Sequence, residues 1–149
     1  MNTETKIYIY KKTILIVSIV VFIISLTQPA YYIDRTDYDA WSNSLLLLIF
    51  GWIGAMGGGS GLVWLANPFI LISWISVFKN LKTSIIFGAL ASIFSSSFLL
   101  FKKVISSEAP TYSIITDYKL GYWLWTISIC FFTFGLIIIY FTNKPKKEL

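Results

Sequence analysis

Long apolar runs, separated by short polar segments, dominate this sequence. Residues 13–28, 61–78, 83–101 and 120–141 contain no charged side chain, and each approaches or exceeds the ~20 residues that a helix needs to cross a bilayer. No linker rich in Pro, Ser or charge divides the chain. The pattern therefore predicts an all-α integral membrane protein with four transmembrane helices in a single domain over residues 1–149.

The first apolar run also has the charged flank and apolar centre of a secretory signal. Gln28 would occupy the −3 position of the cleavage site, where a small residue is preferred, so it fits poorly. We therefore expect residues 13–28 to stay in place as the first span. Lys11 and Lys12 then mark one interface, and Tyr31 and Tyr32 mark the other.

The number of membrane crossings in residues 44–78 is ambiguous, because this stretch is too long for one crossing and short for two. Four crossings place eight basic residues on the side of the termini and four on the other side, whereas five crossings give six and six. The positive-inside rule favours four. Residues 44–56 are then a short re-entrant or interfacial helix before the second span. Both termini are predicted to face the cytoplasm, in a bacterial inner membrane.

Composition narrows the chemistry that the protein can perform. Of its 149 residues, 56% are hydrophobic and 13% are charged, and there is no histidine and one cysteine. Metal clusters, disulfides and Cys-His nucleophiles are thereby excluded, and we expect no catalytic residue, metal or cofactor. The net charge of +5 comes from lysines scattered in ones and twos at the ends of spans, so nucleic acid is not an expected partner.

A stripe of small residues marks the third long span. Ser84, Gly88, Ser92 and Ser96 are spaced four apart, which places them near one face of a helix. Small and hydroxyl side chains allow helices in a membrane to approach closely. The stripe predicts either helix packing within the chain or a subunit interface, and a polar pore lining is a third alternative.

A glycine run precedes an amide in the second span. Gly57, Gly58 and Gly59 interrupt the apolar sequence, and Asn67 comes directly before Pro68. In many transporters, broken helices with freed backbone groups form substrate and ion sites, which would make this a solute site. Alternatively, the glycines form a tight corner, and the Asn67 side chain satisfies carbonyls that Pro68 leaves without an N–H partner.

The loop after the first span mixes acidic and aromatic residues: Asp34, Arg35, Asp37, Asp39 and Trp41. Such a mixture suits recognition of a protein partner, or loose binding of a cation. The spacing does not match an EF-hand. The alternative is a solvated loop whose aromatic residues lie at the lipid headgroups.

The sequence has few residues suited to catalysis and many small and aromatic residues, which favours a non-catalytic function. We expect an oligomeric or accessory subunit that acts through helix packing and its outer loop. Besides the lipid bilayer, its partners would be further copies of itself or a second membrane protein. The alternative function is a channel or uncoupled facilitator for a small ion or neutral solute, with its site near Asn67 and the glycine turn.

Overall fold

The computed structural model describes residues 2–34, 42–105 and 112–143. It is mostly helical, and among these residues four helical segments are long and apolar enough to cross a membrane. Three of them are the helix α1 (Thr3–Leu26), the helix α5 (Leu120–Thr142), and α4 (Leu81–Ser97) with its 3-10 extension η3 (Phe98–Leu100). The fourth joins the 3-10 helix η2 (Gly59–Leu65) to α3 (Ala66–Ser76). The prediction of four apolar helices of spanning length is confirmed.

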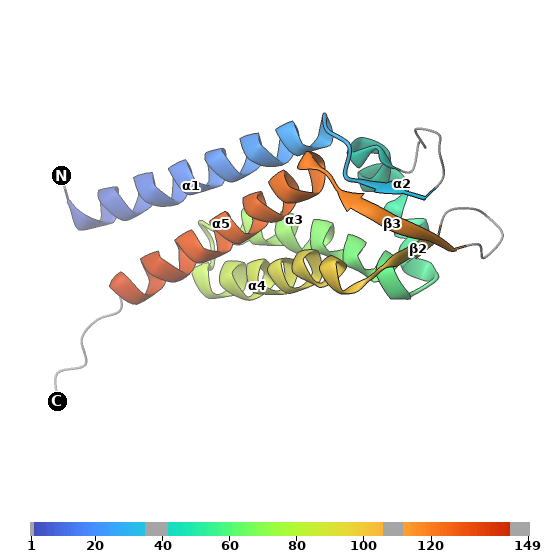
Figure 1. Cartoon of the computed structure of the whole chain (residues 1–149). Helices are drawn as coiled ribbons and strands as arrows, with labels where there is room; N and C mark the ends of the chain where they lie inside the picture. Colours follow the sequence, from blue (N-terminus) through green and yellow to red (C-terminus); the bar gives the residue numbers. More distant parts are fainter. Residues whose placement is uncertain (1, 35–41, 106–111, 144–149) are drawn as a thin grey trace.

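The long helices form a bundle in which α1 packs against α5, and α4 packs against both α3 and α5 (Figure 1). The two ends of the described chain lie at the same end of the bundle, with the turn between α3 and α4. The short helix α2 (Ser44–Met56) and the strands lie at the opposite end. We call this opposite end the sheet end.

Helix boundaries differ most from prediction in α1, which begins at Thr3 rather than near residue 13. Lys6, Lys11 and Lys12 lie inside this helix. Lysine is a good helix former, so charge limits the membrane-embedded part of a segment without ending the helix. By contrast, α2 has the predicted bounds, because Asn43 caps its first turn by accepting from the N–H groups of Leu45 and Leu46.

A three-stranded antiparallel sheet corrects the prediction of an all-α fold. Its strands are β1 (Tyr31–Ile33), β2 (Lys103–Ile105) and β3 (Tyr112–Tyr118), in the order β1-β3-β2. Tyr31 pairs with Tyr118, and Val104 pairs with Ser113. The sheet thereby connects the segment that follows α1 to the segments that flank α4 and α5.

Two apolar clusters hold the fold together. The first fills the middle of the bundle, where Ile70, Ile129, Phe132 and Leu136 have no exposed surface. The second lies under the sheet and includes Tyr31, Phe98, Val104 and Tyr122. The inward side chains of the strands therefore cover one end of the bundle instead of forming an independent domain.

Candidate functional site

The glycine turn reverses the chain between α2 and η2. Gly58 and Gly59 have φ angles of 73° and 59°. Residues other than glycine adopt such positive φ angles only at an energetic cost. Further along, a Cβ atom on Gly61 would overlap the backbone carbonyl of Gly54, and one on Gly51 would overlap the Trp64 ring. The glycines thus allow α2 and η2 to pack against each other as a tight hairpin.

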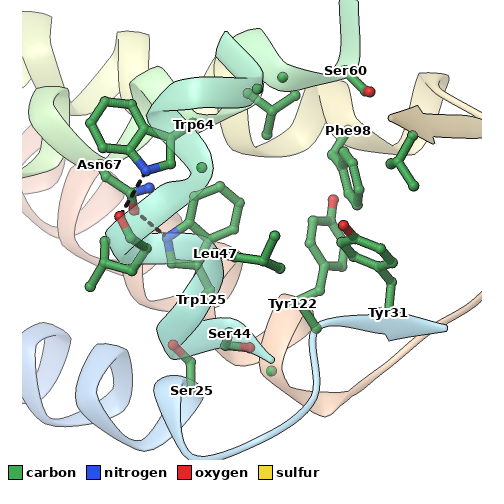
Figure 2. Close-up of a pocket in the computed structure, with 18 of the residues that line it drawn as sticks. Ser25, Tyr31, Ser44, Leu47, Ser60, Trp64, Asn67, Phe98, Tyr122 and Trp125 are labelled. Carbon is green, nitrogen blue, oxygen red and sulfur yellow. Dashed lines mark hydrogen bonds between the residues drawn. The ribbon is translucent and has the colours of Figure 1, made fainter. Parts of the chain in front are cut away.

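This hairpin helps to enclose a cavity of about 160 Å³ at the sheet end. The other walls come from the end of α1, the start of α5 and the inner face of the sheet. Figure 2 shows that aromatic rings surround much of it: Tyr31, Trp64, Phe98, Tyr122 and Trp125. The cavity is predominantly apolar, and only a few polar atoms reach its walls.

Most polar groups in these walls already have partners. The Ser44 hydroxyl donates to the Gln28 carbonyl at 2.6 Å, and the Trp64 indole N–H donates to the Leu48 carbonyl at 2.9 Å. The Tyr122 hydroxyl donates to the Ser95 carbonyl at 3.2 Å. The first two bonds hold α2 against the segment after α1 and against η2, the third joins α5 to α4, and all three donors are unavailable to a ligand.

Asn67 differs from these residues, because part of its amide group forms no hydrogen bond within the described chain, although the residue is only 6% exposed. Its Oδ1 accepts a hydrogen bond from the Trp125 indole N–H at 3.0 Å, which links α3 to α5 (Figure 2). Within the described part of the chain, its amide Nδ2 takes part in none of the hydrogen bonds formed. Asn67 therefore presents a donor at the wall of the cavity.

The structural role predicted for Asn67 differs from the one observed. Its oxygen receives the Trp125 N–H instead of its amide serving a carbonyl released by Pro68. Pro68 is the third residue of α3, at the junction where the 3-10 helix η2 passes into α3.

The small-residue stripe of α4 packs inside the bundle over most of its length. Ser84 and Gly88 are buried, Ser92 is half-buried, and Ser96 is exposed. The strict spacing of four residues drifts by about 40° at each step around a helix of 3.6 residues per turn, so the buried face continues through Ala91 and Ser95. Ser96 does not share the contact that the other three residues make.

Reciprocal hydrogen bonds join α4 to α3 at the buried part of the stripe. The Ser73 hydroxyl donates to the Ser84 carbonyl at 2.6 Å, and the Ser84 hydroxyl donates to the Ser73 carbonyl at 2.7 Å. A Cβ atom on Gly88 would lie 2.7 Å from Thr133 Oγ1 on α5. Ser73 and Thr133 were not singled out in the sequence, where each stands alone among apolar residues.

Asp34 is the only residue of the acidic loop prediction within the described part of the chain. Arg35, Asp37, Asp39 and Trp41 lie outside the described residues. Asp34 Oδ1 accepts from the Ile114 N–H at 3.2 Å, and its own N–H donates to the Ile114 carbonyl at 3.0 Å. Asp34 therefore extends the pairing of β1 with β3.

Residues 2–34, 42–105 and 112–143 bring together no cluster of three His, Cys, Asp or Glu residues.

The aromatic residues before and at the start of α5 are the functional candidates that sequence reasoning missed. Tyr122 is buried, and the Trp125 indole N–H donates to Asn67. Tyr118, at the end of β3, donates its hydroxyl to the Phe101 carbonyl at 3.0 Å, and burial raises the pKa of Tyr118. The spacing of three residues between Tyr122 and Trp125 was the available signal for a common face of α5.

The sequence matches no known protein family, and no curated protein or solved structure is significantly similar to it. Function is therefore inferred from the chain's own residues.

Proposed function

We propose that this chain is a non-catalytic integral membrane protein that acts as an accessory subunit and recognises its partner through the sheet end. The outward face of the sheet carries this proposal. Tyr112, Ile114 and Tyr32 are 64%, 49% and 40% exposed there, although each is large enough to stabilise a contact. Aromatic residues beside charged ones are typical of protein interfaces.

Charged groups border this aromatic and aliphatic surface. Lys119 pairs with Asp117, and its ammonium lies 4.5 Å from the centre of the Tyr32 ring. Lys103 pairs in register with Ile114 and shares its face of the sheet. The surface therefore combines an apolar centre with charges at its edge, which supports selective recognition of another protein.

The position of the sheet relative to the chain ends supports an extracytoplasmic partner. Lys6, Lys79 and Lys82 belong to the end of the bundle that holds both ends of the described chain. With the lysines of residues 144–149, the positive-inside rule assigns that end to the cytoplasm. In a bacterial inner membrane the sheet end would then face outward, with α2 at or within the outer leaflet.

The dense packing at the centre of the bundle favours this proposal over the alternative function of a channel. Below Asn67 and Trp125, the space between the helices is filled by Ile70, Ile129, Phe132 and Leu136, all without exposed surface. A conducting pathway needs polar groups or water along its whole length. The cavity at the sheet end is therefore better suited to binding than to permeation.

Photo-crosslinking in cells tests the proposal. A photoreactive phenylalanine derivative replaces Ile114 or Tyr112 on the sheet, and Ile93 is the control because it is similarly exposed but belongs to α4 and not to the sheet. We expect one discrete adduct from the two sheet positions and none from position 93. An adduct of twice the mass of the chain identifies a second copy, and any other mass identifies a different protein. Equal adducts at all three positions, or none on the sheet, would refute recognition there.

A further inference from the structure

A second hollow adjoins the apolar cavity at the sheet end. It has a volume of about 590 Å³ and is lined by the glycine turn, by residues 100–103 and by Tyr112. Ser60 lines both this hollow and the apolar cavity, so the two meet at that residue. We call the second space the basic hollow, because Lys102 and Lys103 supply its charged groups.

The basic hollow has the chemistry of an anion site. Among the described lining residues, Lys102 and Lys103 are charged and none is a carboxylate, and neither lysine forms a salt bridge with a described residue. The space beside Gly58 and Gly59 is open, since an added Cβ atom would meet nothing within 4 Å, although the Gly58 N–H already donates to the Ala55 carbonyl at 3.2 Å. Paired lysines beside open backbone and a tyrosine hydroxyl suit the oxygens of a phosphate group.

The apolar cavity has the chemistry of a hydrocarbon site with one polar contact. Its volume of about 160 Å³ is close to that of an apolar cavity that accepts a benzene-sized molecule, which corresponds to a chain segment of about six carbons. The unpartnered Nδ2 of Asn67 adds a single donor for a carbonyl oxygen. An ester carbonyl would accept a hydrogen bond from this donor.

We propose that the two spaces form one binding site for an anionic phospholipid of the surrounding bilayer. Its phosphate would contact Lys102 and Lys103, and the ester carbonyl and upper acyl chain would lie against Asn67 and Trp125. The depth fits this arrangement, because Trp125 comes five residues after the start of α5, about 7.5 Å along the helix. The basic hollow borders the outward face of the sheet, because Lys103 and Tyr112 belong to both, whereas the apolar cavity lies on the inner side of the sheet.

Native mass spectrometry of the purified full chain tests this site. The detergent-solubilised protein is titrated with phosphatidylglycerol or, separately, with phosphatidylcholine, and bound lipids are counted. We expect one tightly retained phosphatidylglycerol per chain. Replacing both Lys102 and Lys103 with Ala should weaken its binding about tenfold or more. The matched control replaces Lys79 and Lys82, at the opposite end of the bundle, and should change nothing.

Two further variants test the acyl-chain cavity. Leu47→Trp fills the cavity, whereas Leu45→Trp places the same ring on an exposed position of the same helix. Only Leu47→Trp should lower retention. Asn67→Leu and Trp125→Phe both remove the bond between these residues, but only Asn67→Leu removes the donor, so it should weaken lipid binding more. Thermal unfolding by circular dichroism confirms that each variant is folded.

Several results would overturn the proposal. Equal retention of the two lipids by the unmodified protein would mean unselective lipid at the protein surface. Unchanged phosphatidylglycerol binding in the Lys102/Lys103 variant would refute the phosphate contact, and this variant alters only exposed side chains. Lipid selectivity could fail while Ile114, which does not line the hollow, still crosslinks to a protein, so that position distinguishes failure of the lipid site from failure of partner recognition.

Discussion

The seam between α3, α4 and α5 and the cavity at the sheet end differ in how completely their polar groups are satisfied. We define the seam by Ser73, Ser84, Gly88, Ser92 and Thr133. There, Ser73 and Ser84 exchange hydrogen bonds, and Ser92 donates to Thr133 at 3.2 Å. At the cavity, Asn67 keeps an amide donor without a partner among the described residues.

Side-chain size explains this difference. Small residues in the seam let the helices come close enough for hydroxyl groups to reach the backbone of the neighbouring helix. At the sheet end, the rings of Trp64, Tyr122 and Trp125 hold the hairpin, the sheet and α5 apart. Rigid rings cannot collapse into the space between them, so a cavity remains. The seam is therefore built for stability, and the cavity is the region suited to binding.

The largest expected effect comes from the hairpin that closes the cavity. Gly61→Ala should lower the free energy of unfolding by about 3 kcal/mol or more, because the new Cβ would overlap the Gly54 carbonyl. Gly54→Ala is the matched control, since its nearest neighbour is the Gly61 Cα at 3.8 Å, and it should be nearly neutral. Denaturant unfolding in detergent, followed by circular dichroism, measures both. Equal losses would contradict the packing of α2 on η2.

A bulky residue in the seam should have an intermediate effect. Gly88→Leu would press on Thr133 and Ser73, and we expect it to cost about 1–3 kcal/mol of unfolding free energy. Ile86→Phe is the control, because Ile86 is 59% exposed, whereas the adjacent Ile85 packs against the core. The same unfolding assay should find the control nearly unchanged. If both variants were tolerated equally, close packing at Gly88 would be wrong.

Removal of a single hydroxyl group should change the free energy of unfolding least. Ser84→Ala removes the donor to Ser73 and should cost about 0.6–1.7 kcal/mol, the range for hydrogen bonds between helices in membranes. Ser96→Ala alters the exposed member of the same stripe, and its effect on unfolding should lie within about 0.5 kcal/mol of zero. A larger loss at Ser96 would indicate a contact outside this chain, as in a subunit interface.

Much of the helical architecture could be predicted because it depends on local properties. Runs without charge define four helices of spanning length, and Asn43 and Gly57 bracket α2 at the predicted residues. The sheet could not be predicted in this way. Its strands are short, and Tyr31 pairs with Tyr118 far along the chain, so no local alternation of polar and apolar residues marks them.

The candidate site was predicted only in part, for the same reason. Asn67 is conspicuous as an amide among apolar residues, but its partner Trp125 is 58 positions away and belongs to another helix. The cavity depends on how the α2–η2 hairpin, α1, α5 and the sheet meet, which a single sequence does not encode locally. Ser96 was misplaced for a simpler reason, because a spacing of four residues drifts around an α-helix.

Accessibility of single cysteines tests the central claim, that the sheet end and the two chain ends lie on opposite sides of the membrane. In a Cys130→Ser background, cysteine replaces Thr116 on β3, Asn2 or Asn143, and intact cells are treated with an impermeant thiol reagent before or after lysis. We predict labelling of Thr116→Cys in intact cells, and labelling of Asn2→Cys and Asn143→Cys only after lysis. Labelling of Asn2 and Asn143 on opposite sides would contradict the account, because the chain would then cross the membrane an odd number of times.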